Sequence, residues 1–145
     1  MKKLPRPRRE APAARLPKRE RTRRQIIEAA IEVMAEQGPA KAAVQDIAAR
    51  ANVTTGTFYN HFRSKAEIVE AVAGWFSTTM LEAAQGTRRA FQTGAERTVD
   101  GCRRYLRIAR ESPPTAMLIL ELATTSPRML EAIGEFVLAD VRFGI

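Results

Sequence analysis

Small polar side chains and one glycine dominate the segment between residues 55 and 60. They are Thr55, Gly56, Thr57 and Asn60, and one tyrosine, Tyr59, lies among them. Hydroxyl and amide groups hydrogen-bond to phosphate oxygens and base edges, and a glycine lets the backbone approach a partner closely. This composition favours a surface that contacts nucleic acid, with residues 55–61 as a recognition helix. The alternative is a helical hairpin that serves packing alone.

The neighbouring residues predict the elements that would hold this segment. An apolar face at helical spacing precedes it, formed by Val44, Ile47, Ala48 and Ala51. Asn52 should end that helix, because Asn tolerates a left-handed backbone better than most residues. Thr54 should cap the next helix, and Phe58 and Phe62, four residues apart, should pack it on the first. Together these features predict a helix-turn-helix motif.

Two longer helices should flank the motif. Thr22-x-x-Gln25 has the spacing of a capping box, which predicts that the first helix begins near Arg23. Gly38-Pro39 predicts the end of that helix. Ser64-x-x-Glu67 is a second capping box, so another helix should run over residues 65–85.

The remaining residues also predict helices. Thr93-x-x-Glu96 is a third capping box, and the helix after it should turn four side chains inward: Val99, Cys102, Leu106 and Ala109. A short apolar, buried helix should follow over residues 115–123, and Ser126-Pro127 should begin the last one. The expected fold is all-α. It consists of a three-helix DNA-binding domain over residues 21–65 and a helical regulatory domain over residues 66–145.

Positive charge is concentrated at the start of the chain. The protein has 145 residues and a net charge of +8. Residues 1–24 contain eleven Lys and Arg against Glu10 and Glu20, a net +9, which leaves −1 for the remainder. Four prolines in this segment exclude one continuous helix, so residues 1–20 are predicted to form a disordered basic arm. The arm should follow the DNA backbone; the alternative is a solvated charge run that only adds solubility.

Composition narrows the classes of function. The single cysteine, Cys102, excludes an internal disulfide, and no apolar run reaches the roughly 18 residues of a membrane span. No secretory signal follows the first charges, so a cytoplasmic protein is expected. The chain has no glycine-rich phosphate loop, nucleophile elbow or metal-ligand cluster, so neither an enzyme nor a cofactor is expected. The second hypothesis is a basic helical module that binds nucleic acid or anionic surfaces non-specifically through its N-terminal arm.

Residues 21–76 resemble the DNA-binding domain of the tetracycline-repressor (TetR) family of bacterial transcription regulators. The matching residues are Arg23, Ile26-Ile27, Ala29-Ala30, Gly38, Asp46-Ile47-Ala48, Ala51-Asn52-Val53, Thr57-Phe58-Tyr59, His61-Phe62 and Ser64-Lys65. The run Tyr-x-His-Phe-x-Ser-Lys at 59–65 is the most specific part. The chain departs from the family at Asn52, where Gly is usual, and at Ala42-Ala43, where Ser or Thr usually caps the second helix.

The resemblance implies a regulator, most often a repressor, that binds a palindromic operator in double-stranded DNA. The residues expected to bind DNA are Arg21, Arg23, Lys41, Thr54, Thr55, Gly56, Thr57, Tyr59, Asn60, His61 and Lys65. Tyr59 and Lys65 match phosphate contacts of the family. His61 is expected to be either a phosphate neighbour or a packing residue.

The resemblance also implies a pocket for a small-molecule inducer in the C-terminal helices. The candidates to line it are Trp75, Phe76, Tyr105, Met117 and Leu120, with Arg103, Arg104 or Arg107 as polar anchors. The alternative is that these are ordinary core and surface residues. Family members usually continue with two more helices that form a homodimer, so residues 66–145 are expected to be a truncated form of the regulatory domain.

Overall fold

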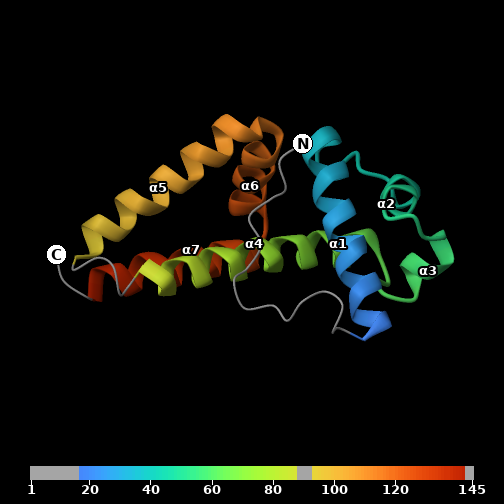
Figure 1. Cartoon of the computed structure of the whole chain (residues 1–145), viewed down its shortest axis with the longest axis horizontal. Coiled ribbons are helices and arrows are strands. Elements are labelled where there is room, and N and C mark those ends of the chain that lie inside the picture. The colour runs from blue at the N-terminus through green and yellow to red at the C-terminus, as the bar shows by residue number, and fades with distance from the viewer. Residues whose placement is uncertain (1–16, 88–92, 143–145) are drawn as a thin grey trace. The chain divides into compact units, whose positions relative to one another are not determined.

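The computed structural model describes residues 17–87 and 93–142 (Figure 1). Every regular element in these residues is an α-helix, which confirms the all-α class. The helices are α1 (Lys18–Gln37), α2 (Val44–Arg50), α3 (Thr55–Tyr59), α4 (Lys65–Thr87), α5 (Gly94–Glu111), α6 (Pro113–Thr125) and α7 (Pro127–Arg142). None of the described helices is long and apolar enough to cross a membrane.

The chain divides into two compact units between Val72 and Ala73, within α4. We call residues 17–72 the helix-turn-helix unit, and residues 73–87 with 93–142 the C-terminal unit. The division lies later in the chain than the domain boundary predicted at residue 65.

Helix α1 begins earlier than the sequence predicted. It starts at Lys18, after Pro17, which provides no side-chain cap. The Thr22 hydroxyl donates instead to the Lys18 carbonyl oxygen, 3.1 Å away within the helix, so the predicted capping box at Thr22 is wrong. Residues 18–20, predicted as part of the arm, are therefore helical, while the arm's residues 1–16 lie outside the described residues.

A glycine ends α1 as predicted. Gly38 has φ 84°, and its backbone N–H donates to the Met34 carbonyl oxygen at 2.8 Å. Positive φ is strained for a residue with a Cβ, so glycine at this position allows a sharp exit from the helix. The exit directs the chain back along α1 into α2.

The core of the helix-turn-helix unit consists of large apolar side chains from all four of its helices. Those less than 2% exposed are Ile26, Ile31, Val33, Met34, Ile47, Phe58, Phe62, Ile68 and Val72. Burial of one such side chain contributes about 1.5–3 kcal/mol. Because α2 and α3 are too short to be stable alone, this shared core fixes their position on α1.

The C-terminal unit begins with α4 from Ala73 and contains α5, α6 and α7. The capping box of α5 is present as predicted: the Glu96 N–H donates to Thr93 Oγ1 at 3.3 Å, and the Thr93 N–H donates to Glu96 Oε2 at 3.2 Å. Leu118, Leu122 and Met129 are its fully buried large side chains. The Ser77 hydroxyl lies 3.4 Å from the Met129 sulfur and ties α4 to α7.

Helix α5 is turned differently from the prediction. Val99 is 49% exposed, Leu106 is 65% exposed and Cys102 is exposed, so the prediction that this stripe faces the core is wrong. The buried residues of α5 are Gly94 and Arg97. The most apolar stripe of α5 was expected to face the core, but the helix packs through its opposite side. The same holds for parts of α6, where Met117 and Leu120 are exposed although Leu118 is buried.

Candidate nucleic-acid interface

The turn between α2 and α3 has the backbone conformation that the sequence predicted. Among the described residues, Asn52 alone combines a side chain with positive φ, at 54°. The residue before it is anchored, because Gln25 Nε2 on α1 donates to the Ala51 carbonyl oxygen at 2.9 Å. Asn in place of the family's usual Gly is thus compatible with the turn.

Thr54 caps α3, as predicted. Its hydroxyl oxygen accepts a hydrogen bond from the Thr57 N–H at 3.1 Å, and the two threonine hydroxyls lie 2.9 Å apart. The helix ends at Tyr59, with Asn60 as its C-cap, so the predicted recognition helix over 55–61 is too long. The His61 N–H bonds to the Phe58 carbonyl oxygen, three residues back, because the chain leaves α-helical geometry there.

Two aromatic anchors set the orientation of α3. Phe58 and Phe62 are almost fully buried, with ring centroids 5.7 Å apart. Tyr59 packs edge-on against Phe58, centroid to centroid 5.4 Å, yet remains 53% exposed. Phe58 points into the core, so the opposite side of this short helix must face solvent.

The outward side of α3 carries small side chains that solvent can reach. Gly56 and Asn60 are exposed, and Thr55 and Thr57 are half-buried. A Cβ placed on Gly56 would meet only the Thr54 hydroxyl, at an ordinary 3.8 Å. Packing within the protein therefore does not require glycine at this position, whereas close approach of a partner to the α3 backbone would.

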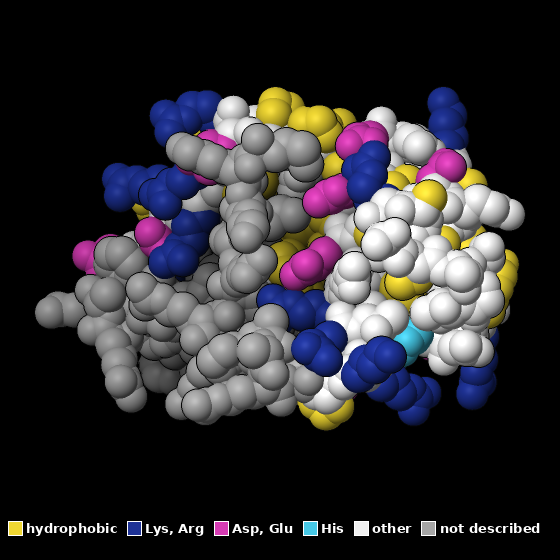
Figure 2. Space-filling view, turned by 45° about the vertical axis from the view of Figure 1, so that its right-hand side comes forward, with side chains coloured by type: hydrophobic (Ala, Val, Ile, Leu, Met, Phe, Trp, Pro, Cys, Tyr) yellow, Lys and Arg dark blue, Asp and Glu magenta, His cyan; other side chains and the backbone are white. Residues whose placement is uncertain are grey.

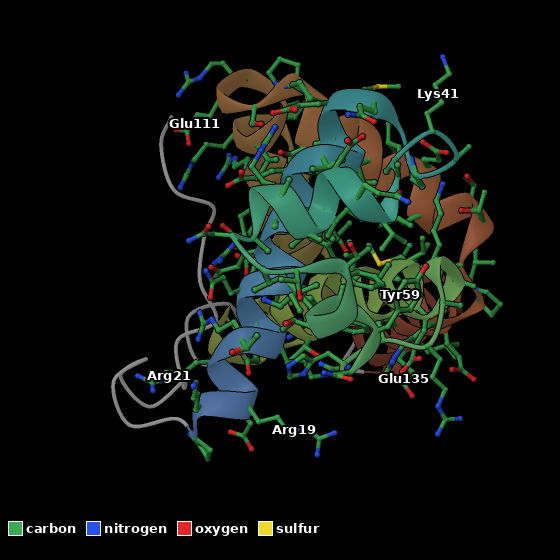
Figure 3. All side chains as sticks on the ribbon, turned by 90° about the vertical axis from the view of Figure 1, so that its right-hand side faces the viewer. Arg19, Arg21, Lys41, Tyr59, Glu111 and Glu135 are labelled. Carbon is green, nitrogen blue, oxygen red and sulfur yellow. The ribbon has the colours of Figure 1, made fainter. Side chains whose placement is uncertain are left out.

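Cationic groups border this surface on α1. The Arg23 guanidinium lies 4.8 Å from the centre of the Phe62 ring, and neither Arg19 nor Arg23 forms an ion pair with another described residue. Figure 3 shows Arg19 and Arg21 together near the start of α1, and Lys41 at the opposite end of the helix-turn-helix unit in that view, with Tyr59 between them.

The half-buried His61 belongs to the same cationic edge. Burial is the main cause that lowers its pKa below the usual value, and the positive charges of Arg19 and Arg23 lower it further. Figure 2 shows the histidine in cyan with Lys and Arg side chains on the same face. Such a site favours an anion, since an anion would relieve repulsion among these groups.

Lys65 has a partner within the protein. Its ammonium donates to the Ala40 carbonyl oxygen at 2.5 Å, which links the start of α4 to the turn between α1 and α2. An ammonium has three donors, so a phosphate contact would be shared with this link. Next to Lys65, the Glu67 N–H donates to Ser64 Oγ at 3.2 Å, while the Glu67 carboxylate accepts from the Arg63 N–H at 2.6 Å.

The segment that forms this arrangement matches a known protein family. Residues 26–72, from α1 to the first part of α4, fit the family described as bacterial regulatory proteins, tetR family. Over these residues the chain matches the TetR family. The resemblance inferred from the run at 59–65 is thereby confirmed.

Two curated transcriptional regulators are similar to this chain over different lengths. The HTH-type transcriptional regulator SrpR of Pseudomonas putida is 47% identical over 53 residues, which cover 37% of this chain and 25% of SrpR. The HTH-type transcriptional regulator TtgR, also of Pseudomonas putida, is 39% identical over 85 residues, 59% of this chain and 39% of TtgR. The chain thus spans a quarter to two fifths of the length of these curated relatives.

Solved structures extend the likeness beyond the helix-turn-helix unit. The putative transcriptional regulator SCO4942 from Streptomyces coelicolor is 26% identical, with a TM-score of 0.61 over 86% of this chain and 67% of that one. A transcriptional regulator from Aquifex aeolicus VF5 has a TM-score of 0.58 over 84% of this chain and 68% of its own, at 21% identity. At that identity the second likeness shows the fold alone.

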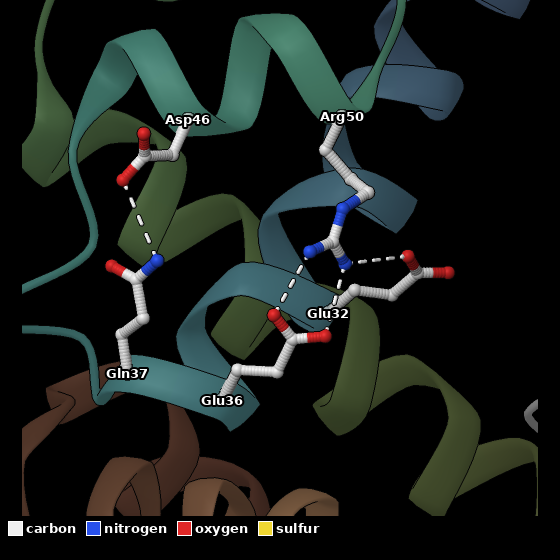
Figure 4. Close-up of polar contacts among 5 residues, drawn as sticks. All are labelled: Glu32, Glu36, Gln37, Asp46 and Arg50. Atoms are coloured by element: carbon white, nitrogen blue, oxygen red, sulfur yellow. Dashed lines mark hydrogen bonds and ion pairs between the residues drawn. The ribbon is translucent and has the colours of Figure 1, made fainter.

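An ion-pair cluster that the sequence analysis missed joins α1 and α2 of the TetR-like motif (Figure 4). Arg50 pairs with Glu36 at 2.9 Å and with Glu32 at 3.2 Å, and Gln37 donates to Asp46 at 3.4 Å. The hydrogen bond from Arg50 lowers the pKa of Glu36. Spacing within one helix could not reveal these pairs, because their partners lie on different helices. The cluster's three carboxylates disfavour a polyanion on this side.

The residues that the family resemblance suggested for an inducer pocket do not all lie close to one another. Phe76 is buried with Trp75 edge-on at 5.3 Å, and the Tyr105 hydroxyl donates to the Ala116 carbonyl oxygen at 3.3 Å. Met117 and Leu120 are 65% and 47% exposed and lie away from the interior of their unit. Of the candidate anchors, Arg104 pairs with Asp100 at 2.6 Å, and Arg103 and Arg107 are exposed.

The described residues contain no group of three or more His, Cys, Asp or Glu side chains that could hold a metal ion. His61, the one histidine in the sequence, has cations as its charged neighbours.

Proposed function

We propose that this protein is a transcriptional regulator that binds double-stranded DNA through α3. The observation that carries the proposal is the two-sided character of α3. Phe58 and Phe62 are buried, and the opposite side presents exposed Gly56 and Asn60 with the hydroxyl of half-buried Thr55. A helix of this kind enters the major groove with its first residues at the base edges.

Backbone contacts would come from the groups around α3. The Tyr59 hydroxyl, the His61 imidazole and the Lys65 ammonium lie in the same short segment, and Arg21 and Arg23 lie on α1. Lys41, in the turn before α2, would contact a phosphate on the other side of the groove. Contacts of this kind fix register and orientation on the duplex but carry no sequence information.

The finer assignment is a ligand-responsive repressor that binds a palindromic operator as a homodimer in the cytoplasm. A single short helix contacts only a few base pairs, so two copies on adjacent half-sites give useful affinity. Support for a ligand comes from Trp75, whose indole N–H is buried and has no hydrogen-bond partner within the described residues. A ligand with an acceptor oxygen would satisfy that donor.

The test is selection from a pool of random duplexes, followed by affinity measurement against a scrambled duplex at fixed salt. The proposal predicts a recurring sequence that binds at least about a hundredfold more tightly than the scrambled one. Equal affinity for all duplexes would support the second hypothesis, that the basic arm binds nucleic acid non-specifically. Repeating the assay with single-stranded RNA and anionic vesicles would then identify the preferred partner.

A further inference from the structure

The turn between α1 and α2, residues 38–43, leads into a helix without a side-chain cap. Ala43 is the N-cap residue of α2, and its methyl group cannot accept the hydrogen bond that a Ser or Thr hydroxyl would accept from the first N–H groups. With seven residues, α2 is also too short to be stable alone. Between two residues of this turn, all of which the structure describes, the one backbone hydrogen bond runs from the Ala42 N–H to the Gly38 carbonyl oxygen at 3.1 Å. The start of α2 therefore needs support from another element.

That support comes from α4. The half-buried Lys65 donates from its ammonium to the Ala40 carbonyl oxygen at 2.5 Å, across 25 positions of sequence. Among the described residues, no other side chain forms a hydrogen bond with the turn. The first turn of α4 is itself fixed, because Ser64 caps the Glu67 N–H at 3.2 Å and Ile68 is fully buried. Lys65 thus ties a loosely bonded turn to a well-anchored helix, through a charged donor that strengthens the bond.

The position of α2 decides the position of α3. In the turn between these two helices the Val53 N–H donates to the Ala48 carbonyl oxygen at 3.0 Å, and Ile47 and Phe58 are both fully buried in the shared core. Lys41 directly follows the tethered Ala40 and is exposed, so the same hydrogen bond limits where the Lys41 ammonium can reach. A displaced start of α2 would therefore move both α3 and Lys41.

We propose that Lys65 is a positioning residue for DNA binding, which acts through Ala40 to hold the start of α2 and to place Lys41. Its consequence for DNA rests on the proposed function of α3, whereas the tether itself is a property of the free protein. A phosphate contact by Lys65 would need no such tether, although one ammonium has donors for both. If Lys65 served a phosphate alone, loss of its charge would leave α2 of the free protein unchanged.

Amide hydrogen exchange of the full chain tests the tether without DNA. The Ile47 N–H reports on the first turn of α2, since it donates to the Ala43 carbonyl oxygen at 3.1 Å. In Lys65→Met its exchange should become faster by about fivefold, the effect of one lost hydrogen bond. Arg63→Met is the matched control, because the exposed Arg63 side chain forms no hydrogen bond or ion pair with another described residue. Unchanged exchange at Ile47 in Lys65→Met would overturn the proposal, as would an equal increase in Arg63→Met.

Affinity for the selected duplex shows whether the tether matters for DNA binding. Lys65→Met should bind more weakly, and adding Ala43→Ser should recover about threefold or more, because a serine cap restores the start of α2. Ala43 has the extended backbone of a capping residue, with φ −89° and ψ 148°, which suits a serine there. In the wild type, Ala43→Ser should change affinity by less than about twofold, because α2 is already in its binding-competent position. No recovery in the double variant would mean that Lys65 acts by its charge alone, which contradicts the proposal.

A double-mutant cycle tests whether Lys65 places Lys41. Lys41→Met should weaken DNA binding in the wild type but much less in Lys65→Met, because Lys41 has already lost its position there. Additive losses would show that the two lysines act independently and would refute the placement of Lys41. Loss of protection at Ile47 in a protein that recognises no DNA sequence would instead contradict the proposed function, while the tether would stand.

Discussion

The side-chain amide of Gln25 on α1 donates to the carbonyl oxygen of Ala51 at the end of α2, over 2.9 Å. The next residue, Asn52, has φ 54° and starts the turn toward α3. The hydrogen bond therefore holds the chain at the point where the direction of α3 is decided. The Gln25 side chain, which was expected to cap the start of α1, thus links α1 to the end of α2.

Gln25→Ala should lower the free energy of unfolding by about 1 kcal/mol, because the part-buried Ala51 carbonyl loses its side-chain donor. Gln37→Ala on the same helix is the control, because its amide makes only a 3.4 Å contact with Asp46 at the surface. Urea denaturation of both variants provides the measurement. Equal losses at the two positions would mean that the Gln25 bond contributes nothing specific.

Gly56→Ala should separate stability from DNA binding. The protein has room for the added methyl group, and alanine in a helix is favoured over glycine by up to about 1 kcal/mol, so stability should hold or rise. Affinity for the selected duplex should fall by about tenfold, a typical cost of one lost base contact. Gly134→Ala on α7, where a Cβ meets no atom within 4 Å, should leave DNA affinity unchanged. Unchanged affinity with Gly56→Ala would show that DNA does not approach the α3 backbone closely at this position.

His61 should make stability depend on pH. Burial, with Arg19 and Arg23, lowers its pKa in the folded protein below the usual value near 6.5. Above about pH 6.5 the histidine is neutral in both states and has no effect. As the pH falls below that value, the unfolded chain binds a proton that the folded protein resists, so stability decreases until the lowered folded pKa is passed. Thermal unfolding across this window should show a smaller decrease for His61→Gln.

DNA binding should have the opposite pH dependence at this residue. A phosphate beside His61 favours the protonated ring and raises its pKa, so binding takes up a proton. Affinity should therefore increase as the pH falls from about 8 to about 6, across the ordinary histidine range, and His61→Gln should flatten the profile. Identical profiles for the two proteins would make His61 a packing residue, the alternative left open by the sequence.

The basic arm should contribute to DNA affinity in a way that does not depend on the DNA sequence. Deleting residues 1–16 removes six of the eleven Lys and Arg of residues 1–24 and leaves α1 intact from Lys18. Binding to any duplex should weaken, and the slope of log affinity against log salt should become shallower by about one for each lost phosphate contact. Anisotropy titrations at several salt concentrations measure both. Equal affinities and slopes with and without these residues would show that the arm only adds charge.

Local sequence signals predicted the helix-turn-helix unit well. The apolar spacing before Asn52, the Thr54 cap and the buried pair Phe58 and Phe62 all have the predicted roles. These features depend on residues within four positions of each other, where helix geometry alone determines which side chains meet. The start of α1 was missed because residues 18–20 were assigned to the basic arm, whereas α1 begins at Lys18 and the Thr22 hydroxyl bonds back to the Lys18 carbonyl oxygen within the helix.

The C-terminal unit was harder to predict. Periodicity shows that α5 has one apolar and one polar face. It does not show which face packs on the rest of the C-terminal unit, and in α5 the packed face is the one opposite the apolar stripe. Gly94 and Arg97 are buried there and Leu106 is exposed. The link from Lys65 to Ala40 and the pairs of Arg50 with Glu32 and Glu36 likewise depend on how separate helices meet.

The most direct test of the central claim is the ratio of affinities for the selected duplex and a scrambled duplex, compared between the wild type and the variant Thr55→Ala/Asn60→Ala. Both substitutions lie on the outward side of α3 and leave Phe58 and Phe62 in place. The account predicts that the ratio falls toward one while affinity for the scrambled duplex changes little, because the cationic groups on α1 are untouched. A variant that keeps the wild-type ratio would show that sequence recognition lies elsewhere in the chain.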